Sequence, residues 1–418
     1  MKKILICALV LGLAVMFALP AFAFKIESGK DTTFYFGGIV FTDLAAWNRS
    51  KELFQPTTQK SDNTQMILNL PNNSRLRGSL EVGNVGGYWE LRLGGNQQNA
   101  QGVSGNFSST GGYYFVESGK LYGYYKFGNC TLLAGKTDGH VYSVLPYQNL
   151  GNDENRHSGG QGWGGVYDQR VTQVRFSQDV SKSFGYDISL VQPMYYFDSG
   201  TGSATGAPAA NGTAGAVQSY ATFPMVAAKL RMNFGAVSLM PAGYIQYVKW
   251  DNLAPALNKQ TPDDNMTSWA AVLPVVVKAG AFTGTFQGAY GQNMGSRFNT
   301  AQGVLDKQSV YHGYGRTPNG AVKNTTGYNA FADLAFTSGP VTPHFYVGWD
   351  KATNDDVYVG DKYNQRWMYG VGVNWKIADS FYLIPEFTYY NWGNNPTAAK
   401  NPSLGTEWLG GVQFQFVF

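Results

Sequence analysis

Four histidines are the side chains of this sequence best suited to acid–base chemistry near neutral pH: His140, His157, His312 and His344. Nucleophilic catalysis would need one of them beside a nucleophile and an orienting group. The four are widely separated in the sequence, only His344 falls in an expected strand, and no Gly-x-Ser-x-Gly elbow occurs. The pattern does not favour an enzyme, although distant residues can meet in a fold.

A glycine-rich segment, Gly160-Gln161-Gly162-Trp163-Gly164-Gly165, formally matches the Gly-x-Gly-x-x-Gly pattern of dinucleotide sites. Such a site needs a strand before the motif and a helix after it, so that the helix N-terminus holds the pyrophosphate. Here a polar segment precedes the motif and a strand pattern follows. We therefore interpret the glycines as loop flexibility and expect no bound cofactor.

Metal chemistry has little support in the residue pattern. The acid pairs Asp263-Asp264 and Asp355-Asp356 lack the spaced ligand series of a calcium loop, so solvated loop charge is favoured over a divalent-cation site. Cys130 is the only cysteine beyond the first segment of the chain, which excludes an internal disulfide and a thiolate cluster. No metal is expected.

The first 23 residues have the layout of a secretory signal peptide. Lys2 and Lys3 precede an apolar run over residues 4–19, and the small-residue box Ala21-Phe22-Ala23 follows. We expect cleavage after Ala23, leaving one domain over residues 24–418; an uncleaved membrane anchor is the alternative. The protein is thus predicted to be exported.

Composition points away from a soluble enzyme. Charged residues make up 14% of the chain and aromatic residues 15%, whereas about a quarter of residues are usually charged in soluble domains. Without Lys2 and Lys3 of the signal segment, the net charge falls from +4 to +2, which is close to balance, so nucleic acid is not an expected partner. No apolar run of about 18 residues follows the signal segment, which leaves a β-barrel as the membrane-spanning fold compatible with the sequence.

Several segments alternate with the period of two that a two-faced strand requires. In residues 407–418 one parity is polar, with Glu407, Gln413 and Gln415, and the other is aromatic or apolar. Residues 366–377 and 381–389 repeat this pattern. A soluble sandwich would produce the same alternation, but the signal segment and the Tyr- and Trp-rich strand ends favour a barrel.

Short and long connections alternate along the chain, as in transmembrane barrels. The short breaks, all but the last of which contain glycine, asparagine or proline, are Gly83-Asn84-Val85-Gly86, Phe127-Gly128-Asn129, Asn233-Phe234-Gly235, Lys278-Ala279-Gly280, Ser338-Gly339-Pro340 and Ala378-Asp379-Ser380. Counting hairpins predicts an all-β antiparallel barrel of about 16 strands. Two segments are ambiguous: residues 32–47 are apolar on both faces, which contact between barrels would explain, and residues 63–82 form one strand or a strand and a bend.

Short motifs resemble the general diffusion porins of Gram-negative bacteria, which are 16-stranded trimers. Asn73-Ser74-Arg75-Leu76-Arg77-Gly78 is similar to an early strand of that family, and residues 120–136 to its fourth and fifth strands. Residues 169–176 resemble the strand that follows its long third loop, and Phe418 matches its C-terminal aromatic residue.

The resemblance implies that residues 137–169 fold into the barrel and narrow it. In such a channel, basic residues on the wall face acids on the loop and create a transverse field. The wall candidates, whose polar parity points to the lumen, are Arg75, Arg77, Arg92, Lys126, Lys136 and Arg175. The loop carries scattered acids in place of the family's acidic motif, namely Asp138, Asp153, Glu154 and Asp168.

The sequence thus predicts an outer-membrane porin, a passive channel for ions and small hydrophilic solutes. Its implied partners are outer-membrane lipid and lipopolysaccharide, the solutes themselves and two further copies of the chain. A substrate-specific channel, a barrel that sheathes an electron-transfer partner and an adhesin remain alternatives.

Overall fold

The computed structural model describes most of the chain beyond the expected signal segment, which lies outside the described residues. The described ranges are 24–27, 32–51, 63–71, 74–96, 113–139, 141, 144–150, 163–166, 170–193, 197–198, 217–220, 223–252, 264–294, 315–316, 322–356, 362–394 and 403–418. Over these ranges, no helix has the length and apolar character needed to cross a membrane.

Antiparallel strands make up most of the described part of the chain. Its first half contains β1 Phe24–Glu27, β2 Thr32–Arg49, β3 Asn63–Asn69, β4 Arg75–Val82, β5 Val85–Asn96, β6 Tyr113–Phe127, β7 Cys130–Asp138, β8 Arg170–Asp179, β9 Phe184–Val191, β10 Phe197–Asp198, β11 Val217–Tyr220 and β12 Met225–Phe234. Its second half contains β13 Val237–Leu239, β14 Ala242–Asn252, β15 Asp264–Ala279, β16 Phe282–Gln292, β17 Gly315–Arg316, β18 Val322–Lys323, β19 Thr326–Phe336, β20 Val341–Thr353, β21 Tyr363–Ala378, β22 Phe381–Asn391 and β23 Thr406–Val417.

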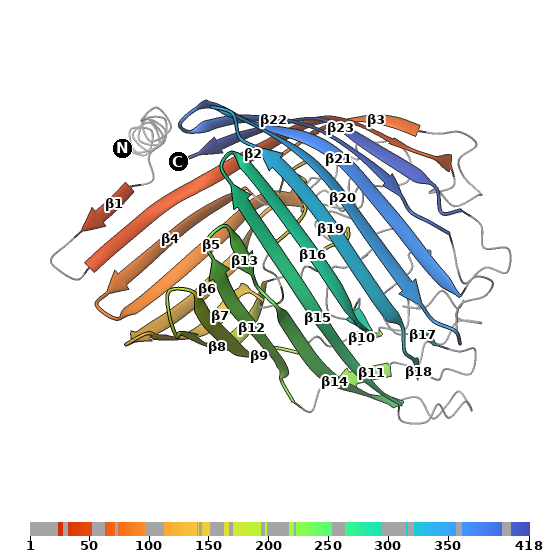
Figure 1. The fold of residues 1–418 in the computed structure, drawn as a ribbon, viewed down its shortest axis with the longest axis horizontal. Helices are drawn as coiled ribbons and strands as arrows, with labels where there is room; N and C mark the ends of the chain where they lie inside the picture. The colour runs from red at the N-terminus through yellow and green to blue at the C-terminus, as the bar shows by residue number, and fades with distance from the viewer. Residues whose placement is uncertain are drawn as a thin grey trace, which may run out of the picture.

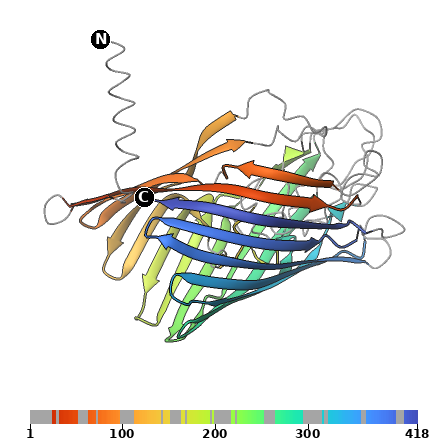
Figure 2. The ribbon, with the colours of Figure 1, turned by 90° about the horizontal axis from the view of Figure 1, so that it is seen from above.

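The sheet closes on itself as a barrel of 16 spanning strands, which confirms the predicted fold class. Neighbours along the chain pair with each other, and the last strand, β23, pairs with β2 over residues 39–49. Figures 1 and 2 show these two strands side by side, with the other strands running obliquely around the barrel. Closure leaves the main sheet without a free edge over the spanning region.

The ambiguous segment over residues 63–82 is a strand and a bend. Both β3 and β4 pair with β2, so together they form the second spanning strand. Pro71 lies at the break, where it has no N–H to contribute to the ladder. Ser74 N donates to Pro71 O, and Ser74 Oγ accepts a hydrogen bond from Phe41 N, so the side chain restores the contact that the ladder loses.

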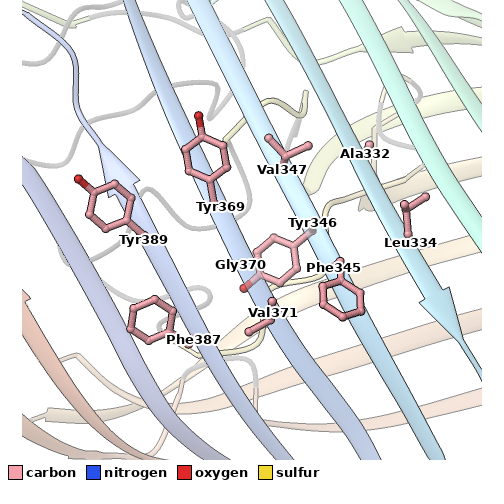
Figure 3. Close-up of a pocket in the computed structure, with 10 residues that line it drawn as sticks. All are labelled: Ala332, Leu334, Phe345, Tyr346, Val347, Tyr369, Gly370, Val371, Phe387 and Tyr389. Carbon is pink, nitrogen blue, oxygen red and sulfur yellow. The ribbon is translucent and has the colours of Figure 1, made fainter.

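Alternating burial shows which face of each strand points inward. On β21, Arg366 is 5% exposed, whereas the outward-facing Tyr369 and Val371 are 47% and 46% exposed. The apolar parity therefore faces outward, as a lipid-facing wall requires and a soluble sandwich does not. The outer face also holds a shallow pocket of about 410 Å³ (Figure 3). Its lining is Ala332, Leu334, Phe345, Tyr346, Val347, Tyr369, Gly370, Val371, Phe387 and Tyr389.

Tight turns join the strands at one end of the barrel, where the sequence predicts them. Five of them contain a glycine with positive φ, a backbone conformation that other residues adopt at a cost: Gly83, Gly128, Gly235, Gly280 and Gly339. The turn between β8 and β9 was not predicted, because Ser181, Lys182 and Ser183 include no glycine, proline, asparagine or aspartate. Ser181 Oγ holds it by accepting hydrogen bonds from Ser183 N and Phe184 N.

The two apolar faces of β2 have an explanation inside the barrel. Ala45 and Trp47 point inward and are 3% and 6% exposed. They belong to a buried cluster that includes Leu150 and Trp163, which come from the segment between β7 and β8. The inner face is apolar here because other residues of the same chain cover it.

Candidate functional site

Arginines are concentrated on the inner face of β4 and β5. Arg75 pairs directly with Arg92, and Arg77 pairs with Glu90, so all four side chains lie on one face of the sheet. This face is the inner one, because Glu90 is 3% exposed whereas Leu80, on the other face of β4, is 48% exposed. Like charges directly opposite each other destabilise a sheet. A cluster of this kind therefore suggests a role other than stability.

Two acids lie among these basic side chains. Glu90 is 3% exposed, and its carboxylate lies 3.6 Å from Arg75 Nη1 and 3.3 Å from Arg170 Nη2. Asp138 accepts a hydrogen bond from Lys120 Nζ and lies 3.5 Å from Arg170 Nε. We call the side chains of Arg75, Arg77, Glu90, Arg92, Lys120, Asp138 and Arg170 the charged wall.

Sequence reasoning missed Lys120, Glu90 and Arg170. Strand parity could have found Lys120, because it points inward like Lys126 on the same strand. It could also have found Glu90, which is the inward neighbour of Arg92 on β5. Strand parity could not have found Arg170, because its neighbour Val171 is the residue that points inward. Arg170 is the first residue of β8, and from there its guanidinium extends to Glu90.

The remaining wall candidates are placed differently. Arg175 lies next to the charged wall, with Nη2 donating to Asp138 O and Nε donating to Gln173 Oε1 at 3.1 Å. Lys126 points inward but lies near the tight turns, where it binds Glu81. Lys136 does not face the lumen as expected: it pairs with Leu121, which is 61% exposed on the outer face. Leu133 and Gly135 take the inward positions of β7 instead.

The candidate loop acids are also separated. Asp138 is the last residue of β7, so it belongs to the wall and not to the loop that was expected to begin at residue 137. Asp153, Glu154 and Asp168 lie outside the described residues.

Residues 144–150, from the long connection between β7 and β8, bind the inner face of β22 and β23. Glu386 Oε2 accepts hydrogen bonds from Asn149 N at 2.7 Å and Leu150 N at 3.4 Å. Gln413 Nε2 donates to Asn149 O at 3.0 Å. The buried carboxylate thus satisfies backbone groups of the connection that would otherwise lack partners.

Residues 163–166 of the same connection bind β20 and β21. Gly164 N donates to Asp350 Oδ1 at 2.9 Å, and Asp350 also lies 3.0 Å from Arg366 Nε. The Arg366 guanidinium lies 4.0 Å from the centre of the Trp163 ring and 5.9 Å from that of Trp392. Cation–π contact therefore adds to the ion pair.

Gly164 is required by geometry and not by flexibility, which corrects the interpretation of the glycine-rich segment. Its φ is +71°, and a Cβ atom there would lie 2.2 Å from Ala330 O and 2.6 Å from Gly348 Cα. The backbone of the connection thus lies directly against the barrel wall. No strand–turn–helix arrangement for a dinucleotide surrounds this glycine within the described residues.

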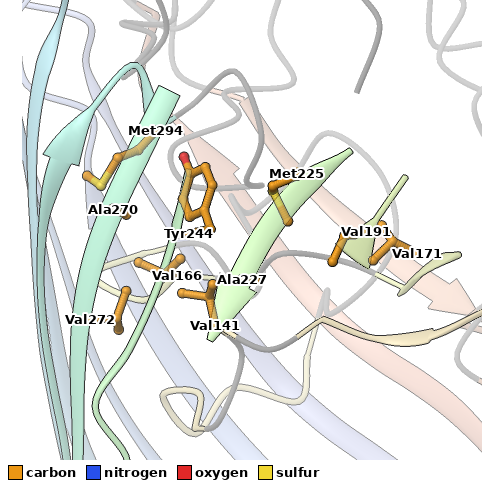
Figure 4. Packing of buried hydrophobic residues seen from close by; sticks show 10 residues of the cluster. All are labelled: Val141, Val166, Val171, Val191, Met225, Ala227, Tyr244, Ala270, Val272 and Met294. Atoms are coloured by element: carbon orange, nitrogen blue, oxygen red, sulfur yellow. The ribbon is translucent and has the colours of Figure 1, made fainter. Parts of the chain in front are cut away.

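The opposite wall also contacts this connection. Val141 and Val166 are fully buried and belong to an apolar cluster with inward-facing residues of β8, β9, β12, β14 and β15 (Figure 4). Burial of this apolar surface stabilises the connection inside the barrel. The described parts of the connection therefore contact β20–β23 on one side and β8–β15 on the other, whereas the charged wall on β4–β8 lies between these two contact regions.

Of the histidines, His344 lies in β20, as expected, and the other three lie outside the described residues. Its ring stacks on Tyr147 with centroids 3.7 Å apart, and its Nδ1 lies 3.1 Å from Asp333 Oδ1. Tyr147 is thus a further side chain of the connection that contacts the wall. Among the described residues, no group of histidine, cysteine and acidic side chains is suited to hold a metal ion.

The chain resembles known proteins in its fold but not in its sequence. No protein-family model matches the chain, and no curated protein matches it. The outer membrane channel DcaP of Acinetobacter baumannii superposes with a TM-score of 0.64 at 12% identity, covering 94% of this chain and 99% of that one.

Two further solved structures share the architecture. OmpT of Vibrio cholerae, an outer membrane protein, in a loop L8 deletion mutant, has a TM-score of 0.54 at 9% identity, covering 93% and 100% of the two chains. OmpF of Salmonella typhi, in complex with daunomycin, has a TM-score of 0.53 at 9% identity, covering 94% and 100%. The chain thus has the fold of the 16-stranded outer-membrane porins, to which its short motifs pointed.

Proposed function

We propose that this protein is an outer-membrane porin, a passive diffusion channel for ions and small hydrophilic solutes. The observation that carries the proposal is a closed barrel of 16 strands whose inner face bears the charged wall. Buried charges in a sealed interior are costly, and a water-filled passage removes that cost. The similar fold of DcaP, which is described as an outer membrane channel, supports the same function.

The connection between β7 and β8 serves in this proposal as the constriction. Its described segments contact two sides of the barrel, so solutes pass beside β4–β8, along the charged wall. Basic side chains outnumber acidic ones there, and the resulting field attracts anions and orients water. The passage therefore favours small anions over cations of the same size.

We also propose that the protein forms a trimer, by analogy with a structure of similar fold. One neighbouring structure, OmpT of Vibrio cholerae, is described as a trimer form, and the same arrangement is proposed here, in a bilayer of outer-membrane lipid and lipopolysaccharide. The outward-facing apolar parity is compatible with both lipid and a neighbouring barrel. Export through a cleaved signal peptide remains a prediction, as does the absence of enzymatic activity.

Neutralising the inner arginines should shift ion preference toward cations. The double variant Arg75→Gln/Arg77→Gln removes two charges, which changes the local potential by roughly kT and the permeability ratio by about threefold. The measurement is the reversal potential in a salt gradient. Lys182→Gln, in the exposed turn before β9, is the matched control and should leave the potential unchanged. An unchanged potential in the double variant would exclude these arginines from the passage.

The proposed function itself is tested by single-channel recording of the purified protein in a planar bilayer. Stepwise openings in groups of three would support a trimeric open channel. Silent insertion of a folded, heat-modifiable barrel would overturn the proposal, because a plugged or adhesive barrel conducts little.

A further inference from the structure

Three tyrosines line the inner face directly beside the charged wall. Tyr88 on β5 pairs with Tyr122 on β6, and Tyr124 follows on the same face. The Tyr88 and Tyr122 rings are stacked with centroids 5.4 Å apart and an angle of 23° between their planes. The Tyr122 and Tyr124 centroids are 6.4 Å apart. Three aromatic rings thus form a strip along the interior.

Small residues border this strip on both sides. Tyr88 pairs with Ser79 on β4, and Tyr122 pairs with Gly135 on β7. Gly135 has φ +132°, and a Cβ atom there would lie 2.3 Å from Leu121 O, so a larger residue does not fit. The inward position next to Tyr122 therefore carries no side chain. Both Tyr88 and Tyr122 are partly exposed, so part of each ring is accessible from the interior of the barrel.

Arg77 lies one inward position above the tyrosines. It is two residues from Ser79 on β4, a rise of about 7 Å along the strand. In the part of the chain that the structure describes, Arg77 Nε is buried without a hydrogen-bond partner. The acid opposite it, Glu90, forms ion pairs with Arg75 and Arg170. The Arg77 side chain as a whole is partly exposed, so the rest of its guanidinium is suited to bind an anion from the lumen.

We propose that this part of the inner wall is a recognition site for small aromatic carboxylates. The carboxylate binds the Arg77 guanidinium, a charge-assisted contact that guanidinium geometry favours. The ring lies against Tyr88 and Tyr122 in an offset or edge-on arrangement. Lys120 lies on the same level as Arg77 but is paired with Asp138, so Arg77 is the cation that binds the carboxylate. The inference rests on the proposed function as an open channel. The site would make that channel selective for one class of solute.

The test is block of the ionic current in a planar bilayer by benzoate, with cyclohexanecarboxylate and maltose as comparison solutes. We expect saturable block by benzoate at concentrations about three- to tenfold lower than for cyclohexanecarboxylate, because only benzoate stacks on the tyrosines. Equal block by the two acids, or block by maltose without block by benzoate, would overturn the inference.

Two variants distinguish the contribution of the tyrosine rings to the block from that of the arginine charge. Tyr122→Leu should remove the preference for benzoate, whereas Arg77→Gln should weaken block by both acids. Tyr369→Leu, on the outer face, is the matched control and should change neither. A Tyr122→Leu barrel that is folded by heat-modifiability and keeps the preference contradicts the proposal. Absence of any current in the unmodified protein would instead overturn the channel function.

Discussion

Replacing Glu386 with alanine should release residues 144–150 from the inner wall and make the open channel unstable. Glu386 accepts hydrogen bonds from two backbone N–H groups of this segment, Asn149 N and Leu150 N. A hydrogen bond to a charged group contributes about 1.5–3 kcal/mol, so the detached population should rise by about ten- to a hundredfold. Single-channel recordings should show excess current noise and a second conductance level.

The control for this experiment is another buried carboxylate on the inner face. Asp187 on β9 is 5% exposed and forms ion pairs with Lys229 and Arg231, which are wall residues on β12. Asp187→Ala removes a buried charge without touching residues 144–150 through any described contact. If both variants were equally noisy, loss of a lumen charge would be the cause and not release of the connection.

Replacing Arg366 with methionine should destabilise the folded barrel by about 3–5 kcal/mol, because it leaves the Asp350 carboxylate buried without its cation. Asp350 is 1% exposed and lies 3.0 Å from Arg366 Nε. Methionine keeps the length and apolar stem of the side chain between Trp163 and Trp392, but it also loses the cation–π contact with Trp163, which adds to the expected loss. The measurement is the temperature at which the heat-modifiable folded band is lost.

An exposed ion pair is the matched control. Lys376 Nζ lies 2.8 Å from Asp379 Oδ1, and the Asp379 side chain is 93% exposed. Lys376→Met should leave the unfolding temperature unchanged, because exposed pairs contribute little. The double variant Arg366→Met/Asp350→Asn removes both buried charges and should recover part of the loss. No loss in Arg366→Met would mean that Asp350 is not charged in the folded barrel.

Strand parity predicted inner-face residues well where the alternation is clean. Arg75, Arg77 and Arg92 point inward as expected, because their outward neighbours are mostly apolar and the period of two is unambiguous. On β7 the alternation is mixed: Leu133 is apolar but points inward, and Lys136 is charged but points outward. A single polar residue therefore cannot establish the register of such a strand.

Aromatic residues near strand ends divide in a way that the sequence does not reveal. Tyr389 lies on the outer face beside the exposed Tyr369, where aromatic rings favour the membrane interface. Tyr390, its neighbour, is fully buried inside the barrel, where its ring contacts Trp163 and its hydroxyl group accepts a hydrogen bond from Gln148. Two adjacent tyrosines of one strand thus lie on opposite faces of the barrel wall, one outside and one inside.

The sequence by itself determined the barrel, because alternation, turn residues and the lengths of connections are local properties that each strand carries independently. Only the tertiary structure decided how the connection between β7 and β8 sits in the lumen. Its contacts join residues far apart in the chain: Asn149 and Glu386 are 237 positions apart, and Gly164 and Asp350 are 186. Such contacts depend on barrel closure, which brings inner faces of distant strands together, and no local pattern encodes that proximity.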